Sequence, residues 1–276
     1  MRLVLLTLLT MCAFAANSLL TRAAVDGGHI GPGAFAVLRV ACGAAMLGGI
    51  ALWRGVSLPL LARVRVAGAA SLSLYMVGFS LAYLTLDAGL GALILFGVTQ
   101  ITMFGHAALT GQPPTVRQVL GATVAFGGLV LVLWPTGESA TDPVGAGLMV
   151  LAGVGWAVYT IAGRSAADPL AATGANFILC LPVLLVVLWG SGLEADAFGI
   201  LLGVVCGAVT SGLGYALWYA VLRQMRGATA AVVQLSVPVI AIAAGVVFLG
   251  EAVSGVILIA AAMVVGGIGW SVTAKR

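Results

Sequence analysis

The chain has 276 residues, of which 62% are hydrophobic and only 7% are charged. A soluble domain of ordinary composition carries roughly 25% charged residues, so this chain has too few polar side chains to cover a surface that faces water. Its formal charge of +4 comes from basic residues scattered along the chain, which leaves no basic patch for nucleic acid. The composition therefore predicts an integral membrane protein.

The cysteines and histidines give no sign of a metal or catalytic site. The four cysteines all lie within apolar runs, without the spacing of a metal site or of a disulfide framework. The two histidines are far apart in the sequence, and no acidic residue lies in the middle of an apolar run. We therefore expect no metal and no cofactor. An enzyme is disfavoured, because it would need a nucleophile with a base or a metal cluster.

The first apolar run follows Arg2 and extends to about Val25, which suits a membrane-spanning helix better than a cleaved signal peptide. Nine breaks then separate ten apolar runs of about 18 to 25 residues each. In chain order the breaks read DGGHIGPG, RGVSLPLLARVR, LDAGLG, TGQPPTVRQ, WPTGESATDP, GRSAADPLA, GSGLEADAFG, LRQMRG and LGEAVSG. The pattern predicts an all-α integral membrane protein with ten transmembrane helices and no soluble domain.

The basic residues indicate how these helices are oriented. With the N-terminus inside, ten of the twelve Lys and Arg residues fall on the inner side, and such a bias sets the orientation of a membrane protein. Seven of the eight acidic residues fall outside, which supports the count, since losing one helix would scramble the alternation. We predict a multi-pass protein of the bacterial inner membrane with both termini cytoplasmic.

The two halves of the chain resemble each other. FAANSLLTR, at 14–22, aligns with WAVYTIAGR, at 156–164, and GFSLAYLTLDAGLGA, at 78–92, aligns with GYALWYAVLRQMRGA, at 214–228. This predicts two repeats, residues 1–140 and 141–276, of five helices each. Because five is odd, the second copy enters the membrane in the opposite sense. Such inverted-topology repeats recur in secondary transporters, although channels carry them as well.

These repeated segments, together with VLRVACGAAML in the second run and VPVIAIAAGVVFLGEAVS near the C-terminal end, resemble the drug/metabolite transporter superfamily, of the EamA type. The resemblance covers nearly the whole chain and rests on the order and spacing of motifs that are individually loose. Within the superfamily the chain is most similar to the YddG-type exporters of aromatic amino acids. The resemblance implies efflux of small metabolites from the cytoplasm through a central cavity.

Polar side chains at membrane depth face protein or a water-filled cavity, and aromatic residues accompany them here. The predicted substrate-binding residues are Asn17, Tyr75, Phe79, Phe96, Gln100, Trp156, Tyr159, Ser211, Tyr215 and Gln234. Asn17 and Tyr159 occupy matched positions in the two halves. The alternative for Asn17 is a hydrogen bond between helices, worth about 0.6 kcal/mol. The alternative for the tyrosines is the aromatic belt at the membrane interfaces.

Two further residues stand out. Arg39 lies about two turns into the second run, where we expect it to snorkel to the outer surface or to pair with a carbonyl or an acid, in a structural role. His106 lies towards the cytoplasmic end of the fourth run. We expect a hydrogen-bonded structural residue there rather than a proton relay.

The absence of a buried acid indicates the mechanism. Proton-driven transporters commonly use an intramembrane carboxylate, so we expect facilitated diffusion by alternating access. The substrates expected are small neutral or zwitterionic metabolites, above all aromatic or hydrophobic amino acids. The expected partners are this substrate and the lipid bilayer, with no nucleic acid; we expect a monomer, although the sequence leaves an oligomer open. A flippase for lipids or headgroup-linked molecules, a multidrug exporter of the same superfamily and a channel are the alternatives.

The predicted topology can be tested at Ser139, in the break that falls outside the membrane in this orientation. A cysteine placed there should react with an impermeant thiol reagent added to intact cells, while the unmodified chain serves as the control. A protein that is expressed and functional but not labelled would contradict the topology.

Overall fold

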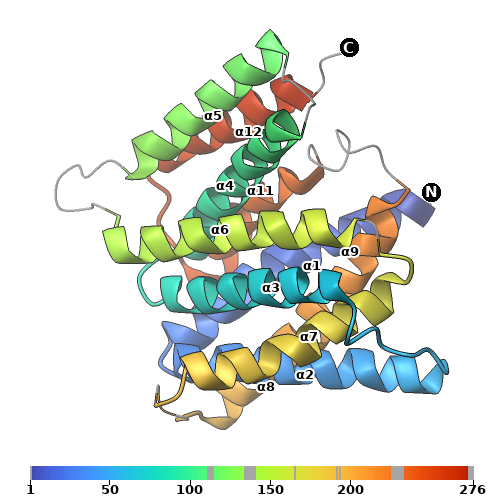
Figure 1. The fold of residues 1–276 in the computed structure, drawn as a ribbon. Helices are drawn as coiled ribbons and strands as arrows, with labels where there is room; N and C mark the ends of the chain where they lie inside the picture. Colours follow the sequence, from blue (N-terminus) through green and yellow to red (C-terminus); the bar gives the residue numbers. More distant parts are fainter. Residues whose placement is uncertain are drawn as a thin grey trace.

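The computed structural model describes residues 2–110, 115–133, 141–164, 166–190, 192, 194–224 and 233–272, and within these residues it contains helices and no strand (Figure 1). The helices are α1 (Arg2–Val25), α2 (Pro32–Trp53), α3 (Arg63–Ala82), α4 (Ala88–Leu109), α5 (Val116–Leu133), α6 (Pro143–Gly163), α7 (Pro169–Val187), α8 (Ala197–Val205), the π-helix η2 (Cys206–Leu213), α9 (Gly214–Leu222), α11 (Ser236–Ala244), the π-helix η3 (Gly245–Leu249) and α12 (Gly255–Val272). The predicted boundary between the repeats falls in residues 134–140, which lie outside the described residues together with Ser139.

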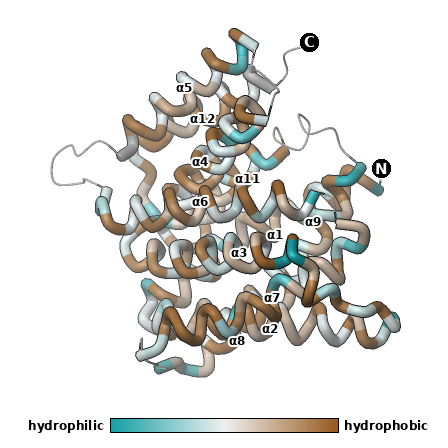
Figure 2. Tube along the Cα trace, viewed as in Figure 1, coloured by the Kyte–Doolittle hydropathy of each residue, from teal (hydrophilic) through white to brown (hydrophobic). Residues whose placement is uncertain are grey.

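Many of the described helices are long and apolar enough to cross a membrane. Seven segments meet this condition: α1, α2, α3, α4, α6, α7 and the continuous segment α8–η2–α9. Three apolar helices are shorter: Val116–Leu131, Ser236–Leu249 and Gly255–Trp270. Figure 2 shows hydrophobic residues along the outer helices, and side chains such as Leu52 and Phe248 are exposed at 84% and 76%. An all-helical chain with so apolar an exterior is a multi-pass membrane protein.

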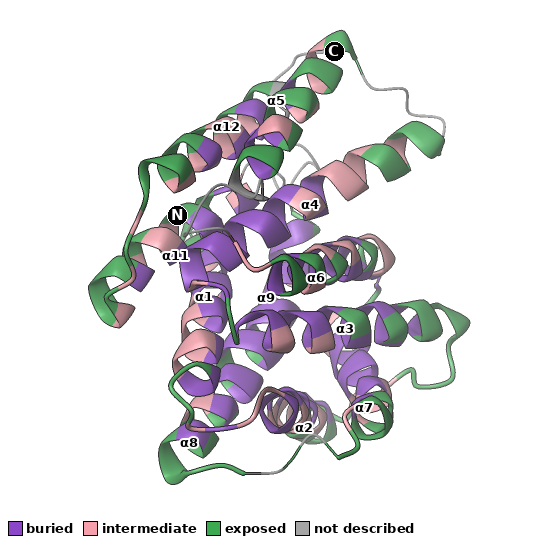
Figure 3. Cartoon of the chain, turned by 90° about the vertical axis from the view of Figure 1, so that its left-hand side faces the viewer, coloured by how far each residue is buried: buried purple, intermediate pink, exposed green. Residues whose placement is uncertain are grey.

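The middle of the bundle is formed by helices from both ends of the sequence. α1 packs against α8, η2, α9 and α11, while α3 packs against α6 and α7, and α4 against α6 and α11. α2 lies against α7 and η2, and α5 pairs with α12 at one edge of the bundle (Figure 1). Figure 3 shows that buried residues gather on α1, α3, α4 and α9. Side chains on the inner faces of these helices therefore meet at the centre.

The α3–α6 contact is close because glycines lie at the crossing. A Cβ atom on Gly155 of α6 would lie 2.8 Å from the backbone oxygen of Ser71 in α3. A Cβ atom on Gly78 of α3 would lie 2.6 Å from the backbone oxygen of Leu148 in α6. Small residues allow helix backbones to approach closely in a membrane. This approach brings Tyr75 of α3 next to α6.

Several acidic residues lie at helix starts. The carboxylates of Asp142, Asp168 and Asp196 accept backbone N–H hydrogen bonds in the first turns of α6, α7 and α8. The N–H of Gly145 and then the hydroxyl of Thr85 lower the pKa of Asp142. A carboxylate is stabilised at a helix N-terminus by unpaired N–H groups and by the helix dipole. Capping therefore accounts for these acids without a role in transport.

Candidate functional site

A small cavity lies at the middle of the bundle, between α1, α3, α4, α6 and α9. It is lined by Phe14, Asn17, Ser18, Tyr75, Phe79, Leu95, Phe96, Trp156 and Tyr215. Its volume is about 10 Å³, which is room for about one water molecule. Each lining residue is at most 4% exposed, so the cavity is shut off from the surface in this conformation.

Six of the ten predicted substrate-binding residues line this cavity: Asn17, Tyr75, Phe79, Phe96, Trp156 and Tyr215. Three others contact a lining residue. The ring of Tyr159 stacks on that of Trp156 with centroids 5.5 Å apart, Gln234 accepts a hydrogen bond of 3.4 Å from the Trp156 indole, and Ser211 donates one to Asn17. Gln100 is buried on α4, one turn beyond Phe96, and does not line the cavity.

The sequence prediction missed Phe14, Ser18 and Leu95, which also line the cavity. Phe14 aligns with Trp156 in the repeat, and this alignment is the sequence signal for its place. Its ring meets those of Trp156 and Tyr215 edge to face, with centroids 5.3 and 5.7 Å apart. Edge-to-face pairs stabilise by about 0.5–1.5 kcal/mol beyond the burial of apolar area. The cavity wall is therefore a packed aromatic cluster.

Asn17 both lines the cavity and joins two helices. Its side-chain oxygen accepts hydrogen bonds from the hydroxyls of Thr210, at 2.7 Å, and Ser211, at 2.9 Å, and from the thiol of Cys206, at 3.3 Å. All three donors belong to η2. The two interpretations of Asn17 are therefore compatible, because the residue holds α1 against η2 and presents its remaining surface to the cavity.

Arg39 lies elsewhere than the sequence suggested. Its side chain neither snorkels to the surface nor pairs with an acid: it is 0% exposed. Its Nε donates to the Ser211 hydroxyl at 2.7 Å, and one terminal nitrogen donates to the hydroxyls of Tyr75, at 3.0 Å, and Tyr215, at 2.7 Å. The guanidinium also lies over the ring of Phe79, 4.9 Å from its centroid. Arg39 thus lies next to the cavity and donates hydrogen bonds to two of its lining residues, Tyr75 and Tyr215.

The sequence held one signal for this position. Arg39 is a single cation within an apolar helix, and an intramembrane ionisable residue marks a functional site by default. Arg39 lies about two turns into α2, deep enough for its side chain to reach Tyr75 and Tyr215 at the cavity. The expectation of snorkelling instead places the side chain at the outer surface.

The π-helix η2 fits closely against Arg39. A Cβ atom on Gly207 of η2 would collide with the backbone oxygen of Arg39, so the glycine permits the contact. A π-helix is rare, occurs mostly as a bulge within an α-helix and is frequent at functional sites. In this chain it brings Cys206, Thr210 and Ser211 to Asn17 and Arg39.

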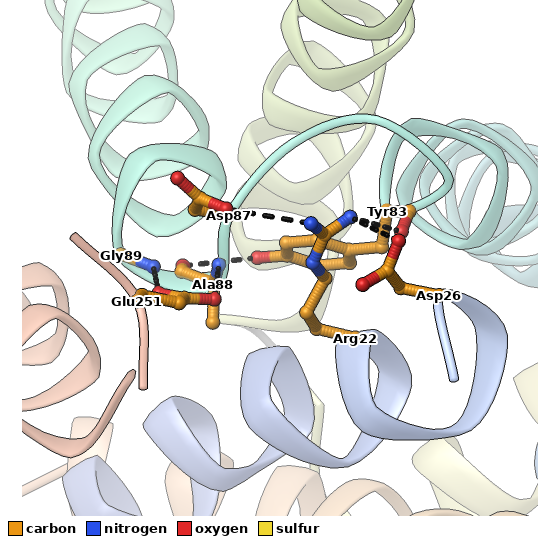
Figure 4. Close-up of polar contacts among 7 residues, drawn as sticks. All are labelled: Arg22, Asp26, Tyr83, Asp87, Ala88, Gly89 and Glu251. Carbon is orange, nitrogen blue, oxygen red and sulfur yellow. Dashed lines mark hydrogen bonds and ion pairs between the residues drawn. The ribbon is translucent and has the colours of Figure 1, made fainter. Parts of the chain in front are cut away.

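Charged residues tie together one end of the bundle, the end with residues 26–31 and 84–87, which the sequence predicts to be outside (Figure 4). Arg22, at the end of α1, forms ion pairs with Asp26, at 3.2 Å, and Asp87, at 3.4 Å. The same guanidinium donates to the backbone oxygen of Tyr83 at 3.1 Å. Arg22 therefore joins α1 to the α3–α4 connection at the predicted outer end.

Glu251 makes a second link at this end (Figure 4). Its carboxylate accepts hydrogen bonds from the backbone N–H groups of Ala88, at 2.6 Å, and Gly89, at 3.4 Å, at the start of α4. Burial raises the pKa of Glu251, against the lowering effect of these two bonds. The residue joins the η3–α12 connection to α4.

The opposite end lacks such ion pairs among the described residues. Arg223, at the end of α9, donates to the backbone oxygen of Ala167 at 2.8 Å. Arg65, near the start of α3, donates to the backbone oxygen of Ala172 at 3.4 Å and to the amide oxygen of Asn176 at 3.5 Å. Neutral acceptors thus hold the predicted inner end, whereas carboxylates hold the outer end.

Comparison with known proteins identifies relatives over the whole chain. A model described as the EamA-like transporter family matches residues 143–273. The Pseudomonas aeruginosa protein PA1977 is 43% identical over 270 residues, which cover 97% of this chain and 93% of the relative. The threonine/homoserine exporter RhtA of Salmonella typhimurium is 32% identical over 158 residues, or 53% of each chain. A solved crystal structure shares the fold with a TM-score of 0.71 and 23% identity, and the match covers 97% of this chain and 98% of that one.

The ion pair between Arg22 and Asp87 should limit access to the cavity from the end of the bundle that the sequence predicts to be outside. Asp87→Asn should raise the rate at which a cysteine at Ser18, in a chain without its native cysteines, reacts with an impermeant thiol reagent. The expected increase is about 1.5- to 5-fold, since an exposed pair contributes about 0.2–1 kcal/mol.

Asp26→Asn is the matched control, because the Arg22–Asp26 pair lies within one helix end and links no separate parts. Equal labelling rates in the two variants would contradict a role for Asp87 in closing the outer end.

Proposed function

Since the chain belongs to the EamA-like transporter family of the drug/metabolite transporter superfamily and is a membrane transporter, we propose that it exports amino acids from the cytoplasm. The preferred substrates carry apolar or aromatic side chains. Transport proceeds by alternating access to the central cavity and by diffusion down the substrate gradient, across the inner membrane of a bacterium.

The observation that carries this proposal is the make-up of the cavity. Its lining combines six aromatic side chains with the amide of Asn17 and the hydroxyl of Ser18. Aromatic faces bind apolar side chains and lie over ammonium groups, while a few polar groups fix the orientation of a small ligand. The threonine/homoserine exporter RhtA among the relatives supports the amino acid class. The preference for aromatic substrates rests on the cavity alone.

The inverted repeat of ten helices is part of the proposal, with residues 1–140 and 141–276 as its two halves. The contacts among the described helices support it. The repeat relates each helix contact to an equivalent contact, its mate, in which every helix is replaced by its counterpart from the other half. The mate of the α3–α6 contact is the contact of α8–η2–α9 with α1, and the mate of the α4–α6 contact is the contact of α11 with α1. The structure contains both of these mates. The pairs α2–α7, α4–α11 and α5–α12 are their own mates. A pseudo-two-fold axis of this kind gives one site similar access from both sides.

The positions of the acidic residues support transport without proton coupling. No carboxylate lines the cavity, and Asp142, Asp168 and Asp196 are engaged as helix caps. His106 is exposed on α4 and lies ten residues beyond Phe96, about 15 Å along the helix. It is too far away to exchange a proton with a bound substrate.

A second candidate, a flippase for lipids or headgroup-linked molecules, has one observation in its favour. A surface groove of about 610 Å³ lies between α7 and α9, with an apolar wall that includes Leu213 and Leu217 and with Arg54 and Arg223 beside it. Arginine can bind a headgroup phosphate. Scrambling of fluorescent phospholipid by the reconstituted protein, without amino acid flux, would favour this candidate.

Proteoliposomes containing the purified chain should take up phenylalanine with equal pH on both sides and an uncoupler present. The physical reason is that no carboxylate and no histidine lines the cavity. The flux should saturate and should show counterflow, which separates a carrier from a channel; empty liposomes are the control. Uptake that requires an imposed pH gradient would overturn the proposed mechanism.

Phe96→Leu tests whether the aromatic wall binds the substrate. Loss of a stacking ring should raise the KM for phenylalanine about 2- to 13-fold, since an aromatic pair contributes about 0.5–1.5 kcal/mol. Phe35→Leu is the matched control, because Phe35 is also buried but lies in a separate apolar cluster and does not line the cavity. It should lower thermal stability in detergent and leave the KM of the remaining protein near that of the parent; the reverse pattern would contradict the site.

A further inference from the structure

The buried guanidinium of Arg39 lacks a counter-ion. Arginine stays charged in proteins, and a buried charge is costly unless it is paired and hydrogen-bonded. No carboxylate of the described residues forms an ion pair with Arg39, and its NH1 nitrogen has no hydrogen-bond partner. The acceptors that it does have are three hydroxyl groups.

A chain of hydrogen bonds runs from Arg39 through the Tyr215 hydroxyl to the Tyr75 hydroxyl at the cavity wall. The Tyr215 hydroxyl accepts from Arg39 and donates to the Tyr75 hydroxyl at 2.9 Å. The Tyr75 hydroxyl therefore accepts from both Arg39 and Tyr215, and among the described residues nothing accepts its own proton. Both tyrosines line the cavity. A positive network with a donor to spare at the cavity wall is suited to an anion.

We propose that Arg39 and the Tyr75 hydroxyl bind the carboxylate of the transported substrate. This inference rests on the proposed function and deepens it, since it makes a carboxylate obligatory and excludes amines and cationic drugs that lack one. A charge-assisted hydrogen bond from arginine to a carboxylate is among the strong ones. The substrate carboxylate thereby serves as the counter-ion that Arg39 lacks within the protein.

One carboxylate suits this site better than a phosphate dianion. A single guanidinium neutralises one negative charge. The other buried arginine, Arg65, is bound to Ala172 and Asn176 of α7, neither of which lines the cavity. The rings of Phe14 and Trp156, at the cavity wall, provide faces for the ammonium group of a zwitterion.

Binding requires the cavity to widen, since its present volume of about 10 Å³ holds about one water molecule. The hydroxyls of Tyr75 and Tyr215 and the Arg39 side chain are therefore expected to rearrange around the substrate. The unpartnered NH1 nitrogen is the group that becomes available for a carboxylate oxygen.

The test compares matched ligands that each differ from phenylalanine in one group: phenylalaninamide lacks its carboxylate, and 3-phenylpropanoate lacks its ammonium group. Phenylalanine, phenylalaninamide and 3-phenylpropanoate are tested on the reconstituted full chain as inhibitors of phenylalanine counterflow, and on the detergent-purified chain by thermal shift. Phenylalanine and 3-phenylpropanoate should bind, and phenylalaninamide should bind at least about 10-fold more weakly, because a hydrogen bond to a charged group is lost. Equal binding of acid and amide would overturn the inference.

Variants of Arg39 and Tyr75 test whether these residues cause the preference for acid over amide. Arg39→Gln should weaken phenylalanine binding about 10-fold or more and abolish the preference for acid over amide, whereas Arg39→Lys should retain part of the preference. Because Arg39→Gln also removes a buried network, Tyr75→Phe provides a milder test. It keeps the ring and should reduce acid binding about 2- to 13-fold, with no change for the amide.

Tyr83→Phe is the matched control, at the residue that directly follows α3. The Tyr83 hydroxyl donates to the backbone oxygen of Ala88 and does not contact Arg39, so this variant should bind both ligands like the parent chain. Loss of acid binding in both tyrosine variants, or in neither, would overturn the role of Tyr75.

The outcomes also separate this inference from the proposed function. Phenylalanine flux with equal binding of acid and amide leaves amino acid export standing and removes the carboxylate site. Binding of 3-phenylpropanoate that depends on Tyr75, without amino acid flux, retains the carboxylate site and overturns amino acid export.

Discussion

Arg39 is a permanent cation inside a bundle whose surface is apolar, so its guanidinium must find hydrogen-bond acceptors within the protein. Three hydroxyls supply them, from Tyr75 on α3, Ser211 on η2 and Tyr215 on α9. Ser211 is bound in turn to Asn17 on α1. The requirement to satisfy one charge therefore determines how α1, α2, α3 and the α8–η2–α9 segment meet, and it places the polar groups of the cavity.

Composition and periodicity predict the helical membrane bundle because an apolar exterior shows directly in the sequence. The proposed repeat, too, rests on aligned residues such as Phe14 and Trp156. The position of Arg39 could not be predicted, since its acceptors lie 36 to 176 residues away in the sequence. Hydroxyls are also common enough in membrane helices to give no signal as partners for a cation.

The two ends of the bundle are held by different interactions, although the helix contacts resemble one another across the halves. Carboxylates join Arg22 to the α3–α4 connection and Glu251 to the start of α4, whereas Arg223 at the other end binds a backbone carbonyl. Ion pairs near a surface are weakened by salt and by water. At the predicted outer end the bundle is thus held by groups that can exchange partners easily, while the aromatic cluster between the ends is tightly packed.

The charge at the centre also breaks the similarity of the halves. α2 and α7 both begin with a proline, Pro32 and Pro169, and lie against each other. Counted from these prolines, Arg39 and Asn176 are both the eighth residue, and both are buried. In the proposed repeat α2 and α7 are counterparts of each other, yet α2 carries a cation at this position and α7 an amide. Under the proposed inverted repeat, the two halves would provide two routes of access, and the unequal pair would give an asymmetric substrate one preferred orientation between them.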